Sequence, residues 1–280
     1  MIVDNPPDEV LFLPGVAGAL FVRYRPPAQH VRHRSDILVV PPFAEEMNKS
    51  RRMFTLLAER LSAVGVGSAI VDLLGTGDSE GDFADARYDT WREDVMTTLK
   101  WLREKSDVPL ALLGLRFGGL LAADAVHRGG FPIDRLVLWQ PATIGELLMT
   151  QFLRLRVAAA MAADAADRET TAALRERLKA EQRLEVGGYT LAADLVAAID
   201  ALRLEALVPP KSIPVSWIEL GSGALAPASA KVCDSWRKRD VSVDAVSIAG
   251  PAFWSAVEIT TAPAFAERTV SVLGGREAAA

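Results

Sequence analysis

The sequence predicts an α/β fold in which helices cover both faces of a mostly parallel sheet. Two observations support this prediction. Short apolar runs alternate along the chain with longer segments whose apolar residues recur at helical spacing. The short runs are continuously apolar, which is typical of strands in a parallel sheet covered on both faces. The chain has 280 residues, 50% of them hydrophobic, so it can bury a large core, and we expect one domain with an insertion.

The first half of the chain predicts a hairpin followed by repeated strand–helix units. A Pro14-Gly15 turn separates two apolar stretches, Leu11–Leu13 and Ala19–Tyr24, and so predicts the hairpin. Continuous apolar runs predict the strands that follow, at Ile37–Val40, Gly67–Val71, Leu110–Leu113 and Leu136–Trp139. Apolar residues at helical spacing predict the first two helices, with Met53, Leu56, Leu57, Leu61 and Val64 in one, and Trp91, Val95, Leu99 and Leu102 in the other.

The second half contains a long interruption of this pattern. Residues 143–207 are rich in Ala, Leu and Arg and show no strand signal, so we expect a helical lid inserted between two parts of a core, 1–142 and 208–280. The strand pattern resumes at Ile213–Ile218 and Val241–Val246. A closing helix is expected at Pro263–Leu273.

Composition excludes several classes of function. A net charge of -5 argues against nucleic-acid binding. Cys233 is the single cysteine and the start has no signal-peptide pattern, so we expect a cytoplasmic protein. The longest apolar run, Val157–Ala163, is too short to span a membrane. The three histidines, His30, His33 and His127, lack metal-ligand spacing, and no phosphate-binding glycine loop is present, so we expect no metal and no cofactor.

Two glycine motifs resemble those of the α/β-hydrolase fold. Asp72–Gly81 resembles the D-x-x-G-x-G-x-S loop of its lipase and aminopeptidase branches, and Gly114–Gly118 has the G-x-S-x-G spacing of a nucleophile elbow. The order of strands, elbow, lid and closing helix is also that of the α/β-hydrolase fold. This resemblance covers most of the chain and implies a mostly parallel sheet with helices on both faces and a helical lid insertion.

Five segments together resemble the second of the two hydrolase-like families associated with the exosortase A system. They are Pro41–Met53, Gly114–Arg116, Leu138–Pro141, Thr150–Arg156 and Gly250–Trp254. The resemblance implies a bacterial protein that accompanies exopolysaccharide synthesis and the sorting of PEP-CTERM proteins. It also implies the name hydrolase, which that family carries because of its fold.

The positions of the catalytic triad hold residues that cannot form one. Arg116 stands in the nucleophile position, and a guanidinium stays protonated and has no lone pair with which to attack a carbonyl. Gly223 occupies the position of the acid and Phe253 that of the histidine. Because no histidine follows His127, no shift of the alignment restores a general base. The sequence therefore indicates a pseudoenzyme.

Arg116 still suits the binding of an anion. The helix that begins after it directs its N-terminus at the cleft, and backbone N–H groups of Phe43 and Phe117 are the expected oxyanion donors. An arginine at such a place favours a carboxylate or phosphate. The alternative is that Arg116 pairs internally with an acid that holds the cleft together; the candidates are Glu45, Glu46, Asp72 and Glu219.

The aromatic residues and the lid leave further alternatives open. Phe253 and Trp254 either plug the cleft or offer a stacking surface to a sugar ring. Phe152–Arg156, where apolar residues alternate with arginines, is either an ordinary amphipathic helix or a docking surface for an acidic partner or lipid head group.

Three hypotheses follow from the sequence. The first is a non-catalytic protein that binds an anionic small molecule, a glycan, a lipid-linked precursor or a protein partner. The second is a hydrolase or transferase with an unconventional mechanism, in which Glu45, Glu46 or Glu219 activates water near Arg116. The third is a structural partner protein whose lid mediates oligomers.

Overall fold

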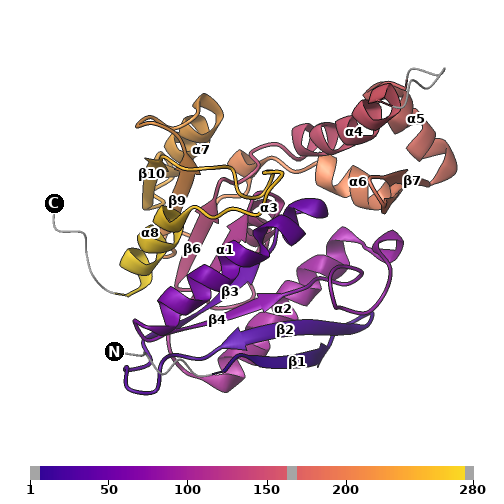
Figure 1. The fold of residues 1–280 in the computed structure, drawn as a ribbon. Coiled ribbons are helices and arrows are strands. Elements are labelled where there is room, and N and C mark those ends of the chain that lie inside the picture. The colour runs from indigo at the N-terminus through magenta and orange to yellow at the C-terminus, as the bar shows by residue number, and fades with distance from the viewer. Residues whose placement is uncertain (1–6, 163–168, 275–280) are drawn as a thin grey trace.

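The computed structural model describes residues 7–162 and 169–274, and an eight-stranded sheet forms its centre (Figure 1). The strand order is β1-β2-β4-β3-β5-β6-β9-β10, and all pairs from β4 to β10 are parallel. β1 and β2 pair antiparallel with each other, as does β2 with β4. The strands are β1 Glu9–Pro14, β2 Ala19–Arg25, β3 Ser35–Val40, β4 Val66–Val71, β5 Leu110–Leu115, β6 Arg135–Trp139, β9 Val215–Leu220 and β10 Val243–Ile248.

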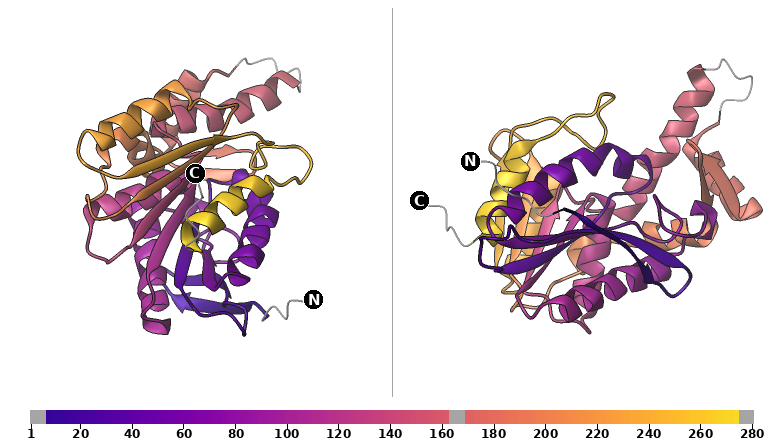
Figure 2. Two further views of the ribbon diagram at one scale, coloured as in Figure 1. Left: turned by 90° about the vertical axis from the view of Figure 1, so that its left-hand side faces the viewer. Right: turned by 60° about the horizontal axis from the view of Figure 1, so that its bottom comes forward.

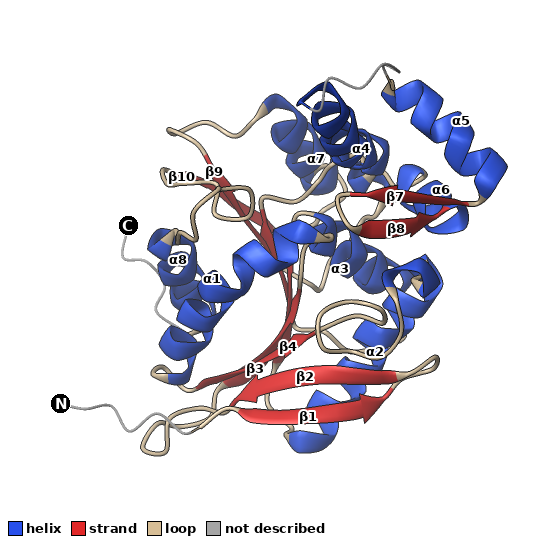
Figure 3. Ribbon diagram, turned by 45° about the vertical axis from the view of Figure 1, so that its right-hand side comes forward, coloured by secondary structure: helices blue, strands red, loops and turns tan. Residues whose placement is uncertain are grey.

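Helices cover both faces of this sheet (Figure 3). On one face lie α1 Glu45–Ser62 and α8 Pro263–Leu273; on the other lie α2 Tyr88–Lys105, α3 Phe117–Arg128 and α7 Pro227–Arg237. Every residue of β3, β4 and β5 is buried, because these central strands are covered from both sides. The predicted fold class is confirmed.

A separate group of elements projects from the edge of the sheet where its parallel strands end (Figures 1 and 2). It contains α4 Gly145–Ala162, α5 Thr171–Glu181, β7 Arg183–Val186, β8 Tyr189–Ala192 and α6 Ala193–Asp200. This group lies within the predicted lid, 143–207, of which residues 163–168 fall outside the described residues. The limits of 143 and 207 stay a prediction.

The expectation that the lid has no strands is wrong. β7 and β8 form a two-stranded antiparallel sheet of their own. In β7 the burial alternates, with Leu184 and Val186 buried and the charged residues Arg183 and Glu185 exposed, so the strand lacks the continuous apolar run of the central sheet.

No helix within the described parts of the chain is long and apolar enough to cross a membrane.

Candidate functional site

The site is built on the tight turn that joins β5 to α3. Arg116 lies between them with φ 54° and ψ -113°, a backbone conformation that non-glycine residues rarely adopt and that is typical of functional sites. The flanking glycines are required by close backbone contacts. A Cβ atom on Gly114 would lie 2.1 Å from the Gly118 oxygen, and one on Gly118 would lie 2.3 Å from the Val40 oxygen. The nucleophile elbow predicted from the glycine spacing is therefore formed, with arginine at its tip.

The guanidinium of Arg116 contacts three side chains from different parts of the chain. Its Nε donates to Glu46 Oε1 on α1 and its Nη2 to Gln151 Oε1 on α4, both at 3.4 Å. It also lies 5.8 Å from the centre of the Trp254 ring, within the range of a cation–π contact. The Arg116 side chain is only 17% exposed. Among the four acids considered as internal partners, the structure pairs Arg116 with Glu46.

Glu46 is a carboxyl group in an unfavourable environment. Burial raises its pKa above the usual value, and the nearby Arg116 opposes this shift without cancelling it. Its second oxygen, Oε2, is buried and has no hydrogen-bond partner in the described part of the protein. The position in the first turn of α1 is electrostatically favourable for an acid. Arg116 and the helix terminus thus favour the charged form of Glu46, whereas burial opposes it.

The other proposed partners of Arg116 have different roles. Glu45 accepts a hydrogen bond at 3.2 Å from Tyr189 Oη, which ties β8 of the lid to α1, and one at 3.3 Å from Asn48 Nδ2 of the same helix. Glu219 is buried and accepts from Trp217 Nε1 at 3.1 Å and the Ala226 backbone at 2.5 Å.

Asp72 binds Arg51 at 2.8 Å. In the same loop, the Ser79 hydroxyl donates to the Asp72 carbonyl and accepts from the Phe21 backbone N–H, so this serine is structural.

Gly223 and Phe253, which the sequence predicts in the positions of the acid and the histidine, have no titratable side chain, and their assignment to these positions stays a prediction. Gly223 is exposed in the loop between β9 and α7, with open space around its Cα. Phe253 is fully buried and packs on Trp139, Trp254 and Phe265 in the core between the sheet and α8. Phe253 is therefore part of the core, and Trp254 is the residue of this pair that faces Arg116.

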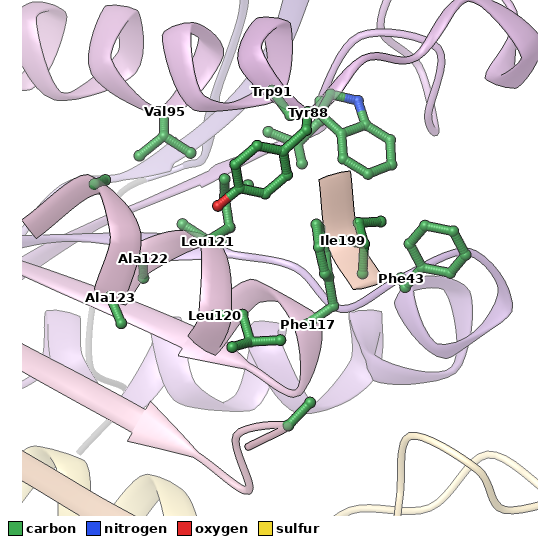
Figure 4. Close-up of a cluster of buried hydrophobic side chains, with 14 of the residues drawn as sticks. Phe43, Tyr88, Trp91, Val95, Phe117, Leu120, Leu121, Ala122, Ala123 and Ile199 are labelled. Atoms are coloured by element: carbon green, nitrogen blue, oxygen red, sulfur yellow. The ribbon is translucent and has the colours of Figure 1, made fainter. Parts of the chain in front are cut away.

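Aromatic side chains form part of the buried hydrophobic cluster around α3, where Phe43, Trp91 and Phe117 lie together with aliphatic residues (Figure 4). Phe43 packs edge-to-face on Trp91, Phe117 and the lid residue Phe152, with ring centres 5.0–6.0 Å apart. The backbone N–H groups of Phe43 and Phe117, the expected oxyanion donors, have no hydrogen-bond acceptor within the described residues. The role of these N–H groups as oxyanion donors stays a prediction.

Two cavities lie near the elbow, and Arg116 itself lines the second of them. The first, here called the α1–α4 cavity, has a volume of about 230 Å³ and largely apolar walls that include Phe43, Leu148, Phe152, Leu155 and Trp254. Glu45, Glu46, Lys49 and Ser255 supply its polar lining. The second, the α4–α7 cavity, has a volume of about 180 Å³ and is lined by residues that include Arg116, Gln140, Thr143 and Ser229. Leu148 and Gln151 line both cavities.

Comparison with known protein families identifies the chain. A family model described as serine aminopeptidase, S33, matches residues 33–186, more than half of the sequence. The chain belongs to this family. The match includes the elbow and the segment that precedes it, but ends before the positions of the acid and the histidine.

Solved structures similar to this S33-family chain share its fold. Est1E from Butyrivibrio proteoclasticus, solved with ferulic acid, superposes with a TM-score of 0.67 at 15% identity over 94% of this chain and 96% of its own. Mouse α/β-hydrolase domain-containing protein 10 gives a TM-score of 0.62 at 16% identity, covering 94% and 96%. A putative hydrolase from Agrobacterium vitis S4 gives 0.62 at 17%, covering 95% and 98%. No curated protein sequence matches the chain.

Sequence reasoning missed the contribution of the lid to this S33-family site. Gln151 and Leu148 from α4 lie against the elbow, and Tyr189 from β8 binds α1. The segment Thr150–Arg156 was among those that carry the closer resemblance, so a signal for Gln151 was present in the sequence. Within the described residues, no cluster of three or more His, Cys, Asp or Glu could hold a metal ion.

Proposed function

We propose that this S33-family chain binds an anionic ligand at Arg116 in place of serine-type hydrolysis. The proposal rests on the enclosed position of the Arg116 guanidinium and on the length of its hydrogen bonds. The guanidinium stands at the tip of the elbow, largely enclosed, yet its two hydrogen bonds are both 3.4 Å long. A guanidinium has five N–H donors, and its bonds to a well-placed carboxylate or phosphate are about 2.7–2.9 Å long. Arg116 therefore has unused capacity for an anion.

Glu46 is the internal competitor for this position. Burial opposes its charged form, so the entry of a second anion beside Arg116 would favour a protonated Glu46. The ligand then exchanges a long ion pair for a shorter, two-pronged one. This exchange makes ligand binding compatible with the pairing between Arg116 and Glu46.

Calorimetric titration of octanoate and octyl phosphate into wild type, Arg116→Ala and Arg116→Lys tests the proposal. The charge-assisted bonds are worth about 1.5–3 kcal/mol, so we expect Arg116→Ala to weaken binding about 10- to 100-fold. Arg116→Lys keeps the charge without the planar fork and should lie between the two. Equal affinity in wild type and Arg116→Ala would contradict the proposal.

We propose further that the ligand belongs to the exosortase A and PEP-CTERM exopolysaccharide system, as a glycan or lipid-linked precursor. The support is the resemblance of five segments, from Pro41–Met53 to Gly250–Trp254. Deletion of the gene should reduce exopolysaccharide, and the wild-type protein but not Arg116→Ala should restore it. Unchanged exopolysaccharide after deletion would exclude this placement.

A second candidate is hydrolysis by an unconventional mechanism with Glu46 as general base. The raised pKa of Glu46 beside Arg116 favours it, since a base with a raised pKa is more effective near neutral pH. A panel of ester, thioester and phosphoester substrates with wild type, Glu46→Gln and Arg116→Ala decides between the candidates. Activity lost in Glu46→Gln supports the enzyme; no activity in any of the three supports ligand binding.

The third hypothesis, a structural partner protein, has one favourable observation. Leu147, Leu155 and Met161 on α4 are exposed apolar side chains. Light scattering during size-exclusion chromatography tests it, and a monomer at all concentrations would exclude oligomers formed through the lid.

A further inference from the structure

The α1–α4 cavity has the character of a hydrocarbon site. Its walls are formed largely by apolar side chains, including Phe43, Phe152 and Trp254. An apolar cavity of about 230 Å³ gains little from water, because water inside needs several polar partners. A hydrocarbon chain placed there would bury apolar surface against these walls.

This cavity lies next to the side chains that contact Arg116. Leu148 and Gln151 line both it and the α4–α7 cavity, into which Arg116 faces. The partners of the guanidinium, Glu46, Gln151 and Trp254, all line the α1–α4 cavity. The cation therefore lines the α4–α7 cavity and contacts three side chains in the wall of the α1–α4 cavity, here also called the chamber.

The polar residues of the chamber do not offer a better place for an anion. Glu45 and Glu46 repel one, and Lys49, the single cation of the lining, lies in the same first turns of α1 as these two acids. At the outer side, Leu155 is 51% exposed and also lines the cavity. The loop that continues from Ser255 carries the exposed apolar residues Val257 and Ile259. The outer side of the chamber is thus partly apolar at Leu155.

We infer that the ligand is an anionic amphiphile, whose unbranched apolar chain occupies the α1–α4 cavity while its carboxylate or phosphate head binds Arg116. This inference rests on the proposed function and adds the chemical class of the ligand. In this arrangement the hydrocarbon chain of the ligand supplies most of the affinity, and Arg116 supplies the selectivity for anions. The two contributions can be measured separately.

A chain-length series measures the contribution of the chain. The probes are butanoate, hexanoate, octanoate and decanoate, each below its micelle concentration, with the octyl and decyl phosphates to compare head groups and 1-octanol as a neutral control. Burial of one methylene corresponds to a change in affinity of about fourfold, so binding should tighten by about that factor per methylene until the cavity is full. The neutral alcohol should bind more weakly than octanoate.

Two tryptophan variants on the same helix test where the hydrocarbon chain of the ligand binds. Leu155→Trp places a large ring at the cavity and should flatten the chain-length series. Met161→Trp is the matched control, because Met161 is 67% exposed and is not among the residues that line either cavity. Circular dichroism shows whether both variants fold.

Each result separates the two claims. Anion binding that depends on Arg116 but not on chain length overturns the inferred chain and leaves the proposed function. Chain-dependent binding that Arg116→Ala does not weaken overturns the proposed function and the assignment of the head group. If the dependence of affinity on chain length is equally steep in Leu155→Trp and Met161→Trp, the hydrocarbon chain of the ligand lies outside the α1–α4 cavity. Failure of every probe to bind overturns both claims.

Discussion

Removal of Arg116 should destabilise the protein in a way that depends on pH. Two unit charges 3.4 Å apart attract by about 5 kcal/mol at an effective dielectric constant of about 20. Much of this attraction offsets the burial of Glu46, whose side chain is 23% exposed. Arg116→Ala leaves that carboxylate without its cation, at an expected cost of about 1–3 kcal/mol in the free energy of unfolding.

The direction of the pH dependence follows from the pKa of Glu46. Burial raises this pKa above 4.5, so the folded state binds the proton more tightly than the unfolded chain, and Glu46 opposes folding as the pH rises above 4.5. The Arg116 side chain lowers the pKa of Glu46, so its removal raises this pKa further and enlarges the penalty. The cost of Arg116→Ala should therefore be smaller at pH 4.5 than at pH 8.

Urea denaturation of wild type and Arg116→Ala at both pH values measures this difference. The same substitution made in a Glu46→Gln background is the control, since no carboxyl group then titrates at position 46 and the pH dependence should disappear. A loss of stability that is equal at pH 4.5 and pH 8, or that persists unchanged in the Glu46→Gln background, would refute the reasoning.

Three further predictions concern other positions. Burial raises the pKa of Asp94 to about 6, so the free energy of unfolding should fall by about 3 kcal/mol as the pH rises from below 3.8 to above 6. Asp94→Asn should remove this decrease in urea denaturation, and an unchanged decrease would contradict the prediction. Phe253→His puts an imidazole into the core and should cost about 2–4 kcal/mol without producing ester hydrolysis, whereas a stable, active variant would show that the position is catalytic. Tyr189→Phe removes the hydroxyl that binds Glu45 and should accelerate hydrogen exchange in β7 and β8 with a global cost of about 0.5–1.5 kcal/mol; unchanged exchange would show that the bond does not hold the lid.

The fold was accessible from the sequence because its signals are local. Continuous apolar strands such as Ile37–Val40 and the glycine spacing of the elbow each indicate one conformation. The β7–β8 hairpin was not predicted, because Arg183–Val186 is short and carries charged residues on its exposed side. The Gly187-Gly188 pair between the two strands was a turn signal that favours a hairpin.

The site was only partly accessible, because its contacts join distant segments. The sequence named four acids as partners for Arg116, and only the packing of α1 against the elbow selects Glu46. Glu219 could not be excluded beforehand, since its bonds to Trp217 and Ala226 depend on the loop after β9. The position of Gln151 depends on how the lid packs on the core, which no local pattern describes.

We propose that the elbow of this chain has no catalytic triad to support it. The most direct test is the rate of p-nitrophenyl butyrate hydrolysis by Arg116→Ser, which restores the serine of the family motif. Because no histidine follows His127 and Phe253 is buried in the core, we expect a rate no higher than that in buffer, as for wild type. Turnover by the serine variant above that rate would show that another residue serves as the base and that the elbow can still support catalysis.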